Sequence, residues 1–227
     1  MLLRCFINRG AHSKVRIVLY LLCFAIVVVP LAVKAQSAAF EPCASKLFEA
    51  FKQINESDSS KKLGLKSVLN SSALKIQGAY DEWAECIEGC SIPGLDFVTI
   101  KGDRRKDPDL RGKVLVLNFW FKSCAPCVAE MPSLNKLYHE FKGKDVLFIG
   151  FATDSEQALK PDYLDTGKFL FDIVPNSGNI AKEFKFAGFP TTYIVDQKGR
   201  VVKAWTGYRK DPYETAKPII YQLLSHR

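Results

Sequence analysis

Residues 114–132 decide the fold and read VLVLNFWFKSCAPCVAEMP. The first seven form a short, largely apolar run with β-branched residues, which is typical of a strand buried on both faces. The residues from Pro126 to Phe141 are amphipathic in the manner of a helix. Cys124 and Cys127 fall at the junction. We therefore expect both cysteines at the amino end of a helix that directly follows a buried strand.

This position gives the cysteine pair its predicted chemistry. A cysteine at a helix amino terminus faces unpaired backbone N–H groups and the positive end of the helix dipole, and both favour the thiolate. Cys124 is therefore expected to be the attacking sulfur. Cys127 lies one turn later on the same side, where it can attack a mixed disulfide formed at Cys124. Two alternatives are an inert structural disulfide and a zinc site, which would need two further ligands.

The chain around this segment alternates between strand-like and helix-like stretches. Further strands are expected at 146–152, 169–174, 191–196 and 201–205, and the last two are joined by a hairpin turn over Gln197–Arg200. Helices are expected at 155–166 and 179–184 and within 212–226, where Pro218 leaves the start of the last helix open. This order predicts an α/β fold with a mixed central sheet flanked by helices.

Residues 36–90 have a different pattern. Apolar residues near helical spacing predict helices over 41–54 and 79–88, with a polar loop over 55–62 between them. We interpret 36–90 as a small helical lead-in and 91–227 as the main domain.

Residues 1–35 have the features of an export leader. A basic stretch ends at Arg16, an uncharged run follows from Ile17 to Val33, and small residues precede a possible cleavage site after Ala35. A cleaved signal peptide is favoured over a membrane anchor. Both alternatives place the rest of the chain outside the cytoplasm, most simply in a bacterial periplasm.

The charge of the chain argues against a nucleic-acid-binding function. The formal net charge is +8, but five of the Lys and Arg residues lie in the leader, which has no acidic residue. The remainder therefore lacks the excess of basic residues that phosphate binding requires.

Two separated motifs resemble those of the thioredoxin superfamily, and more narrowly its TlpA/ResA-type extracytoplasmic branch. The first runs from Asn118 to Pro132 and includes Trp120, four residues before Cys124. The second is Gly188-Phe189-Pro190-Thr191-Thr192-Tyr193, which is similar to the family's cis-proline loop. The resemblance covers about residue 91 to the carboxyl terminus. It implies a thioredoxin-like fold, protein disulfide or dithiol clients, a membrane-linked thiol electron donor, and neither a metal nor another cofactor.

The resemblance also suggests roles for residues outside the cysteine pair. Phe189 and Pro190 would bind a client strand, although an ordinary trans turn proline is the simpler reading of Pro190 alone. Trp120 is expected with Phe189 and Pro190 among the residues that support client binding, and packing in the core is the alternative. Ordinary thioredoxins carry a buried acid where this chain has Asn118. Glu130 shares a helix face with Cys127 and is predicted to carry its proton, unless it is a surface glutamate.

Three cysteines remain outside the redox motif and the leader. The simplest expectation is one structural disulfide from Cys43 to either Cys86 or Cys90. A second redox relay among these three is the alternative.

The leading functional hypothesis is an oxidoreductase that exchanges disulfides with exported proteins. The resemblance favours the reducing direction, for example keeping cysteines of exported or haem-binding proteins reduced, as cytochrome c maturation requires. The rivals are a peroxiredoxin-like peroxidase and a non-catalytic binding or envelope-assembly module. The Ala125-Pro126 pair between the cysteines is uncharged, so it does not shift the reduction potential of the site toward strongly oxidising values.

Overall fold

The computed structural model describes residues 40–59, 65–186 and 188–225. The leader predicted for residues 1–35 lies outside this range. None of the described helices is both long enough and apolar enough to span a bilayer.

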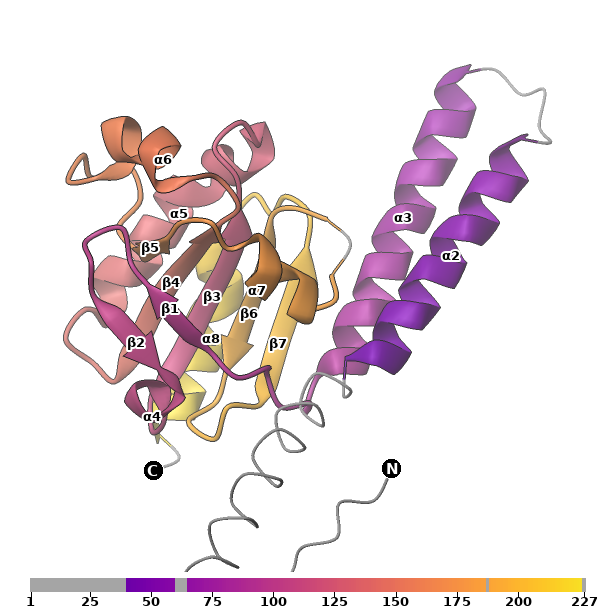
Figure 1. Cartoon of the computed structure of the whole chain (residues 1–227). Helices are drawn as coiled ribbons and strands as arrows, with labels where there is room; N and C mark the ends of the chain where they lie inside the picture. The colour runs from indigo at the N-terminus through magenta and orange to yellow at the C-terminus, as the bar shows by residue number, and fades with distance from the viewer. Residues whose placement is uncertain (1–39, 60–64, 187, 226–227) are drawn as a thin grey trace, which may run out of the picture. The chain divides into compact units, whose positions relative to one another are not determined.

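A five-stranded mixed sheet forms the centre of the domain (Figure 1), in the order β5-β4-β3-β6-β7. Strand β3 (Val114–Trp120) lies in the middle, and all seven of its residues are buried. It pairs in parallel with β4 (Val146–Ala152) and antiparallel with β6 (Thr191–Val195). The edges are β5 (Asp172–Val174), parallel to β4, and β7 (Val201–Thr206), antiparallel to β6.

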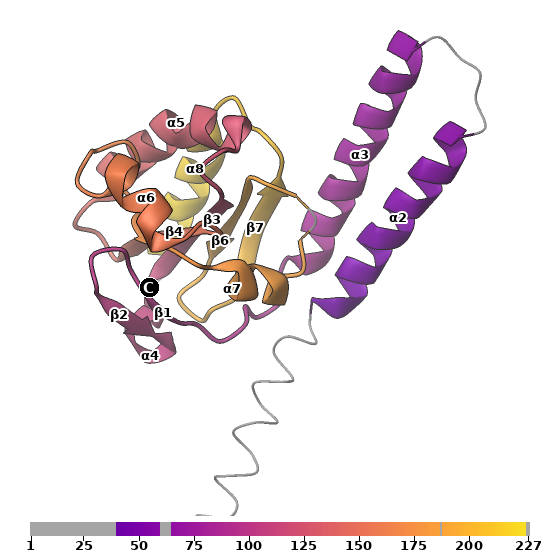
Figure 2. The same ribbon diagram turned by 45° about the horizontal axis from the view of Figure 1, so that its top comes forward.

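Helices cover both faces of this sheet (Figure 2). One face packs against α5 (Ala125–Phe141), α6 (Glu156–Tyr163) and α8 (Pro212–Ser225), and this side contains the two redox-motif cysteines. The opposite face packs against α7 (Gly178–Glu183) and the lead-in helices. The predicted α/β fold, a thioredoxin-like mixed sheet flanked by helices, is confirmed.

The lead-in consists of two long helices that lie side by side, α2 (Glu41–Ser59) and α3 (Leu65–Ile87). Phe40, Leu47 and Trp83 are buried in the same apolar cluster as Tyr193 of β6. The Trp83 and Tyr193 rings meet edge to face with centroids 5.9 Å apart. The lead-in therefore shares a core with the sheet.

Both lead-in helices are longer than predicted. Helix α2 continues through residues 55–59 of the expected loop, because no glycine or proline there stops propagation once the helix exists. Residues 60–62 of that loop lie outside the described residues. Helix α3 begins at Leu65, well before the expected start at Ala79. Its one internal glycine, Gly78, costs about 1 kcal/mol, which is too little to end a helix.

Smaller differences occur elsewhere. The strand expected over 169–174 is confined to Asp172–Val174, because Phe169 and Phe171 stack on each other in the core, with centroids 4.5 Å apart. Helix α8 starts at Pro212 and continues through Pro218. A two-stranded antiparallel sheet, β1 (Asp96–Val98) with β2 (Arg104–Lys106), and the short helix α4 (Asp107–Leu110) were not predicted. Strands of three residues carry too little periodicity to be recognised.

Candidate active site

Cys124 and Cys127 lie where β3 gives way to α5. Cys124 is the residue that caps the helix, and its sulfur accepts a hydrogen bond from the backbone N–H of Cys127 at 3.2 Å. The two cysteines form a disulfide. Both side chains are buried, at 4% and 2% exposure. The Cys124 sulfur thus lies at the amino end of the helix, where the backbone N–H of Cys127 would also stabilise a thiolate.

The turn before Cys124 is fixed by polar contacts to the neighbouring strand and helix. The backbone N–H of Lys122 donates to Asp154 at 2.6 Å. The Lys122 side chain donates to the carbonyl of Ala158 at 2.8 Å and pairs with Asp162 at 2.5 Å. These contacts fix the backbone and side chain of Lys122, two residues before Cys124. Ser123, between them, remains exposed.

The second sequence motif lies opposite this turn. The Phe189–Pro190 peptide bond is cis. The carbonyl of Pro190 accepts a hydrogen bond from Gly207 at 2.8 Å, and the Thr191 hydroxyl donates to the carbonyl of Gly188 at 2.7 Å. Strand pairing aligns Thr191 with Phe119, just before the end of β3. The sheet therefore brings the proline loop to the edge where the cysteines lie.

An aromatic contact joins the two motifs directly. The rings of Phe121 and Phe189 meet edge to face, with centroids 5.3 Å apart. Both side chains are only half-buried. Because Phe121 precedes Cys124 and Phe189 precedes Pro190, this pair forms one wall beside the disulfide.

Trp120 is part of the core. It is 0% exposed and packs edge to face against Tyr163 and Phe169. A side chain without exposed surface cannot touch a client protein. Of the two expectations for Trp120, the structure agrees with support from within the core and not with substrate contact.

Glu130 lies one helical turn after Cys127 on α5 and is 1% exposed. Its Oε1 accepts a hydrogen bond from the Asn118 amide at 3.1 Å, and Oε2 has no partner among the described residues. Burial raises the pKa of Glu130 from 4.5 to about 7, while Asn118 and the backbone amide and charge of Arg209 act to lower it. Glu130 is therefore not a surface residue, and it can exchange a proton near neutral pH.

Sequence reasoning missed the partners of Glu130. The Asn118 amide also donates to the Thr192 hydroxyl at 3.0 Å, so this buried side chain is a bridge between α5 and β6. A single polar residue inside an apolar strand was the available signal. Arg209 had no such signal, because it lies in the loop after β7 and no motif links that loop to Glu130.

The three remaining cysteines lie where α2 begins and α3 ends. Cys43 and Cys86 form a disulfide with a Cα–Cα separation of 5.7 Å, across 43 residues of sequence. Cys90 takes part in neither disulfide and is half-buried. Of the two partners left open for Cys43, the structure therefore selects Cys86.

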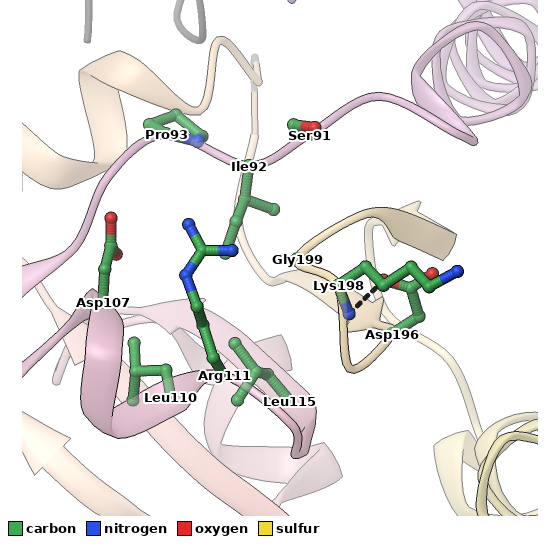
Figure 3. A pocket seen from close by; sticks show the side chains of 10 residues that line it. All are labelled: Ser91, Ile92, Pro93, Asp107, Leu110, Arg111, Leu115, Asp196, Lys198 and Gly199. Atoms are coloured by element: carbon green, nitrogen blue, oxygen red, sulfur yellow. Dashed lines mark hydrogen bonds between the residues drawn. The ribbon is translucent and has the colours of Figure 1, made fainter. Parts of the chain in front are cut away.

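A cavity of about 160 Å³ lies away from the cysteines. Figure 3 shows the Arg111 side chain extending into it toward Ile92, with Lys198 on another wall. The cavity is lined by Leu115 at the start of β3, whereas Cys124 follows the end of that strand. The length of β3 therefore separates this cavity from the redox pair.

The fold and site can be compared with known proteins. Residues 89–204, which include both motifs, match the model of the AhpC/TSA family. A thioredoxin-like protein from Bacillus subtilis, YneN, is 35% identical over 115 residues, covering 49% of this chain and 67% of the relative. The thiol-disulfide oxidoreductase ResA from Bacillus cereus is 27% identical over 132 residues, covering 58% and 76%.

A solved structure supports the same fold. It is described as a thiol:disulfide interchange protein DsbE from Chlorobium tepidum, with a TM-score of 0.54 and 23% identity over 60% of this chain and 97% of that chain. The chain thus belongs to the AhpC/TSA family and is a thioredoxin-like protein-disulfide oxidoreductase.

Proposed function

We propose that Cys124 and Cys127 are the redox-active pair and that the enzyme uses them to reduce disulfides of exported proteins. The observation that carries this proposal is the position of Cys124 as the cap of α5, with Cys127 bonded to its sulfur and Glu130 buried one turn after Cys127. No comparable arrangement surrounds the Cys43–Cys86 disulfide in the described part of the chain.

The first step begins from the reduced enzyme. The Cys124 thiolate attacks one sulfur of a client disulfide, forming a bond between Cys124 and the client while the client S–S bond breaks. The second client sulfur leaves as a thiolate and takes up a proton. The wall made by Phe121 and Phe189, with the cis-proline loop, provides an edge against which an extended client segment can lie.

The second step resolves the mixed disulfide. Cys127 loses its proton and attacks the Cys124 sulfur, so that the client leaves as a dithiol and the enzyme keeps the Cys124–Cys127 disulfide. Two electrons pass from enzyme to client. Glu130 accepts the proton of Cys127, because its carboxyl is buried on the same helix and its pKa of about 7 allows exchange at neutral pH.

The direction and location belong to the same proposal. A membrane-linked thiol donor re-reduces the enzyme, and the clients include exported or haem-binding proteins, as in cytochrome c maturation. The similarity to the thiol-disulfide oxidoreductase ResA supports disulfide exchange, and the uncharged Ala125-Pro126 pair suits the reducing direction. The apolar run of residues 17–33 supports export to a bacterial periplasm, with 1–35 as a cleaved leader, 36–90 as the lead-in and 91–227 as the redox domain. The amino terminus of the protein recovered from cells tests cleavage after Ala35.

Trapping experiments test the proposed chemistry. In Cys127→Ser, a mixed disulfide should accumulate on Cys124 when a client such as insulin is added. Cys124→Ser should trap none, although Cys127 is intact. Accumulation on Cys127 instead would reverse the assignment.

A second assay separates the rival functions. The wild-type enzyme with dithiothreitol should accelerate reduction of insulin disulfides. Consumption of hydrogen peroxide without insulin reduction would favour a peroxidase that uses one peroxidatic cysteine. The absence of both activities would favour a non-catalytic binding module.

A further inference from the structure

Helix α3 of the lead-in reaches the loops that carry the redox site. A Cβ atom placed at Gly188 would lie 2.6 Å from the Tyr80 hydroxyl oxygen, so the helix packs directly against the residues before Pro190. A Cβ at Gly207 would lie 3.7 Å from the side-chain oxygen of Gln77. Gly207 in turn donates to the carbonyl of Pro190. The lead-in therefore contacts both the residue two positions before the cis-proline, Gly188, and the residue that hydrogen-bonds to it, Gly207.

Arg209 is held between this helix and the sheet. Its guanidinium lies 3.9 Å from Asp81 of α3 and 5.6 Å from the centre of the Trp205 ring. The Asp81 carboxylate also accepts a hydrogen bond from Gln77 at 3.0 Å, which fixes its orientation. The Nε atom of Arg209 is buried and has no hydrogen-bond partner among the described residues. The ion pair and the ring are thus the contacts that set the position of the side chain.

The Trp205 ring connects Arg209 to the surroundings of Glu130. Strand pairing aligns Asn118 with Thr192, and Thr192 with Trp205, so the partner of Glu130 and the ring beneath Arg209 occupy one row of the sheet. The groups that act on Glu130 are Asn118 from β3 and the amide and charge of Arg209 after β7. On its own helix, Cys127 lies one turn away. Arg209 supplies the one positive charge that acts on this carboxyl within the described residues.

We propose that Arg209 is a positioning residue of the redox site, held by Asp81 of α3 and the face of Trp205, and that its guanidinium charge stabilises the carboxylate form of Glu130. The helical lead-in is then part of the electrostatic environment of the cysteines as well as of the core. The inference rests on the proposed role of Glu130 and extends it to a residue that acts through Glu130 without touching the client.

The test is the carboxyl titration of Glu130, followed by ¹³C NMR in the oxidised full chain. Arg209→Gln should raise the midpoint by about half a pH unit, because a nearby positive charge favours the carboxylate. Arg209→Lys keeps the charge and should return the midpoint most of the way toward wild type. Asp81→Asn should raise it by a smaller amount, because the guanidinium loses its tether and moves toward solvent.

A matched control uses an ion pair remote from the site. Arg104 pairs with Asp96 at 2.8 Å between β1 and β2, and Arg104→Gln should leave the Glu130 midpoint unchanged. An unchanged or lowered midpoint in Arg209→Gln would overturn the inference. A lowered midpoint in Asp81→Asn would mean that Asp81 only offsets the charge of Arg209, which would overturn the role of α3. If Arg209→Gln does not fold, Asp81→Asn and Arg209→Lys decide the matter.

This titration is independent of the proposed function. It is measured without a client and with the disulfide closed, so it responds to Arg209 even if Glu130 has no part in exchange. Conversely, a Glu130→Gln variant with unchanged exchange would remove the proposed role of Glu130 while leaving a charge shift by Arg209 intact.

Discussion

The two disulfides of this protein differ in what surrounds them. Cys124–Cys127 spans a sequence separation of 3 at the amino end of α5, beside a buried carboxyl and a cis-proline loop. Cys43–Cys86 spans a separation of 43 and joins α2 to α3 inside the lead-in. The entropy lost by an unfolded chain grows with the length of the closed loop, so the short bridge constrains little and the long one constrains much.

This difference indicates that the two disulfides have different roles. The short bridge can open and close with little change in the fold, and its environment stabilises a thiolate and moves a proton. The long bridge has no buried acid nearby among the groups described and contributes to stability. The contrast shows that the surroundings of a disulfide, and not the presence of two cysteines, predict its chemistry.

The largest expected effect separates the two bridges by activity. Cys124→Ser should lower the rate of insulin reduction by on the order of a thousandfold, because no thiolate remains at the helix cap. The double variant Cys43→Ser/Cys86→Ser should retain activity at a temperature where it is folded. Loss of activity in a folded double variant would give the lead-in bridge a redox role and erase the contrast.

The next effect separates them by stability. Removing Cys43–Cys86 should lower the free energy of unfolding by about 2–4 kcal/mol. The upper end of this range is the loop-closure entropy expected for a bridge of this sequence separation. Urea unfolding of the double serine variant measures this change. Reducing Cys124–Cys127 alone should cost less. An equal or larger loss on reducing the short bridge would contradict the assignment.

A smaller effect concerns the buried carboxyl beside the short bridge. Glu130 holds its proton more tightly in the folded state, where its pKa is about 7, than in the unfolded chain, where it is near 4.5. The unfolding free energy of the oxidised protein should therefore fall as the pH rises from 4.5 to 7, by about 3 kcal/mol in all, and then level off.

Glu130→Gln should remove this fall, so that the variant gains stability relative to wild type above pH 7. The same variant should change the pH profile of disulfide exchange and slow the step that uses Cys127. The control is Glu214→Gln, whose carboxylate is exposed and should leave the pH dependence as it is. A wild-type stability that stays flat between pH 4.5 and 7 would speak against a buried, protonated Glu130.

The smallest expected effect is that of Cys90. It lies next to the lead-in bridge in sequence but takes part in neither disulfide. Cys90→Ser should leave insulin reduction unchanged and alter stability by less than about 1 kcal/mol. A marked loss of exchange in this variant would revive a second redox relay among Cys43, Cys86 and Cys90.

The sequence predicts the parts of this molecule whose signals are local. The apolar runs give β3 and β4 with their observed bounds, and the cysteine spacing beside a strand end gives the helix cap. Glu130 could be placed near Cys127 because three residues on a helix bring side chains to one face. The two motifs could be expected to meet only through the family resemblance.

What the sequence could not predict depends on contacts between distant segments. The choice of Cys86 over Cys90 depends on how α2 lies along α3, and both spacings suit a disulfide in sequence terms. The partners of Glu130 come from β6 and from the loop after β7. The start of α3 was missed because Ser67, Asn70, Ser71 and Ser72 are residues that favour caps and turns over helix interiors.

The most direct test of the contrast between the bridges is a redox titration of the full chain, read by differential alkylation and mass spectrometry. Cys124–Cys127 should become reduced at a potential near thioredoxin's, about −270 mV, while Cys43–Cys86 remains oxidised there and opens only below about −300 mV. This order is what a reactive bridge and a structural bridge require. Opening of Cys43–Cys86 at the same potential as Cys124–Cys127, or above it, would contradict the account.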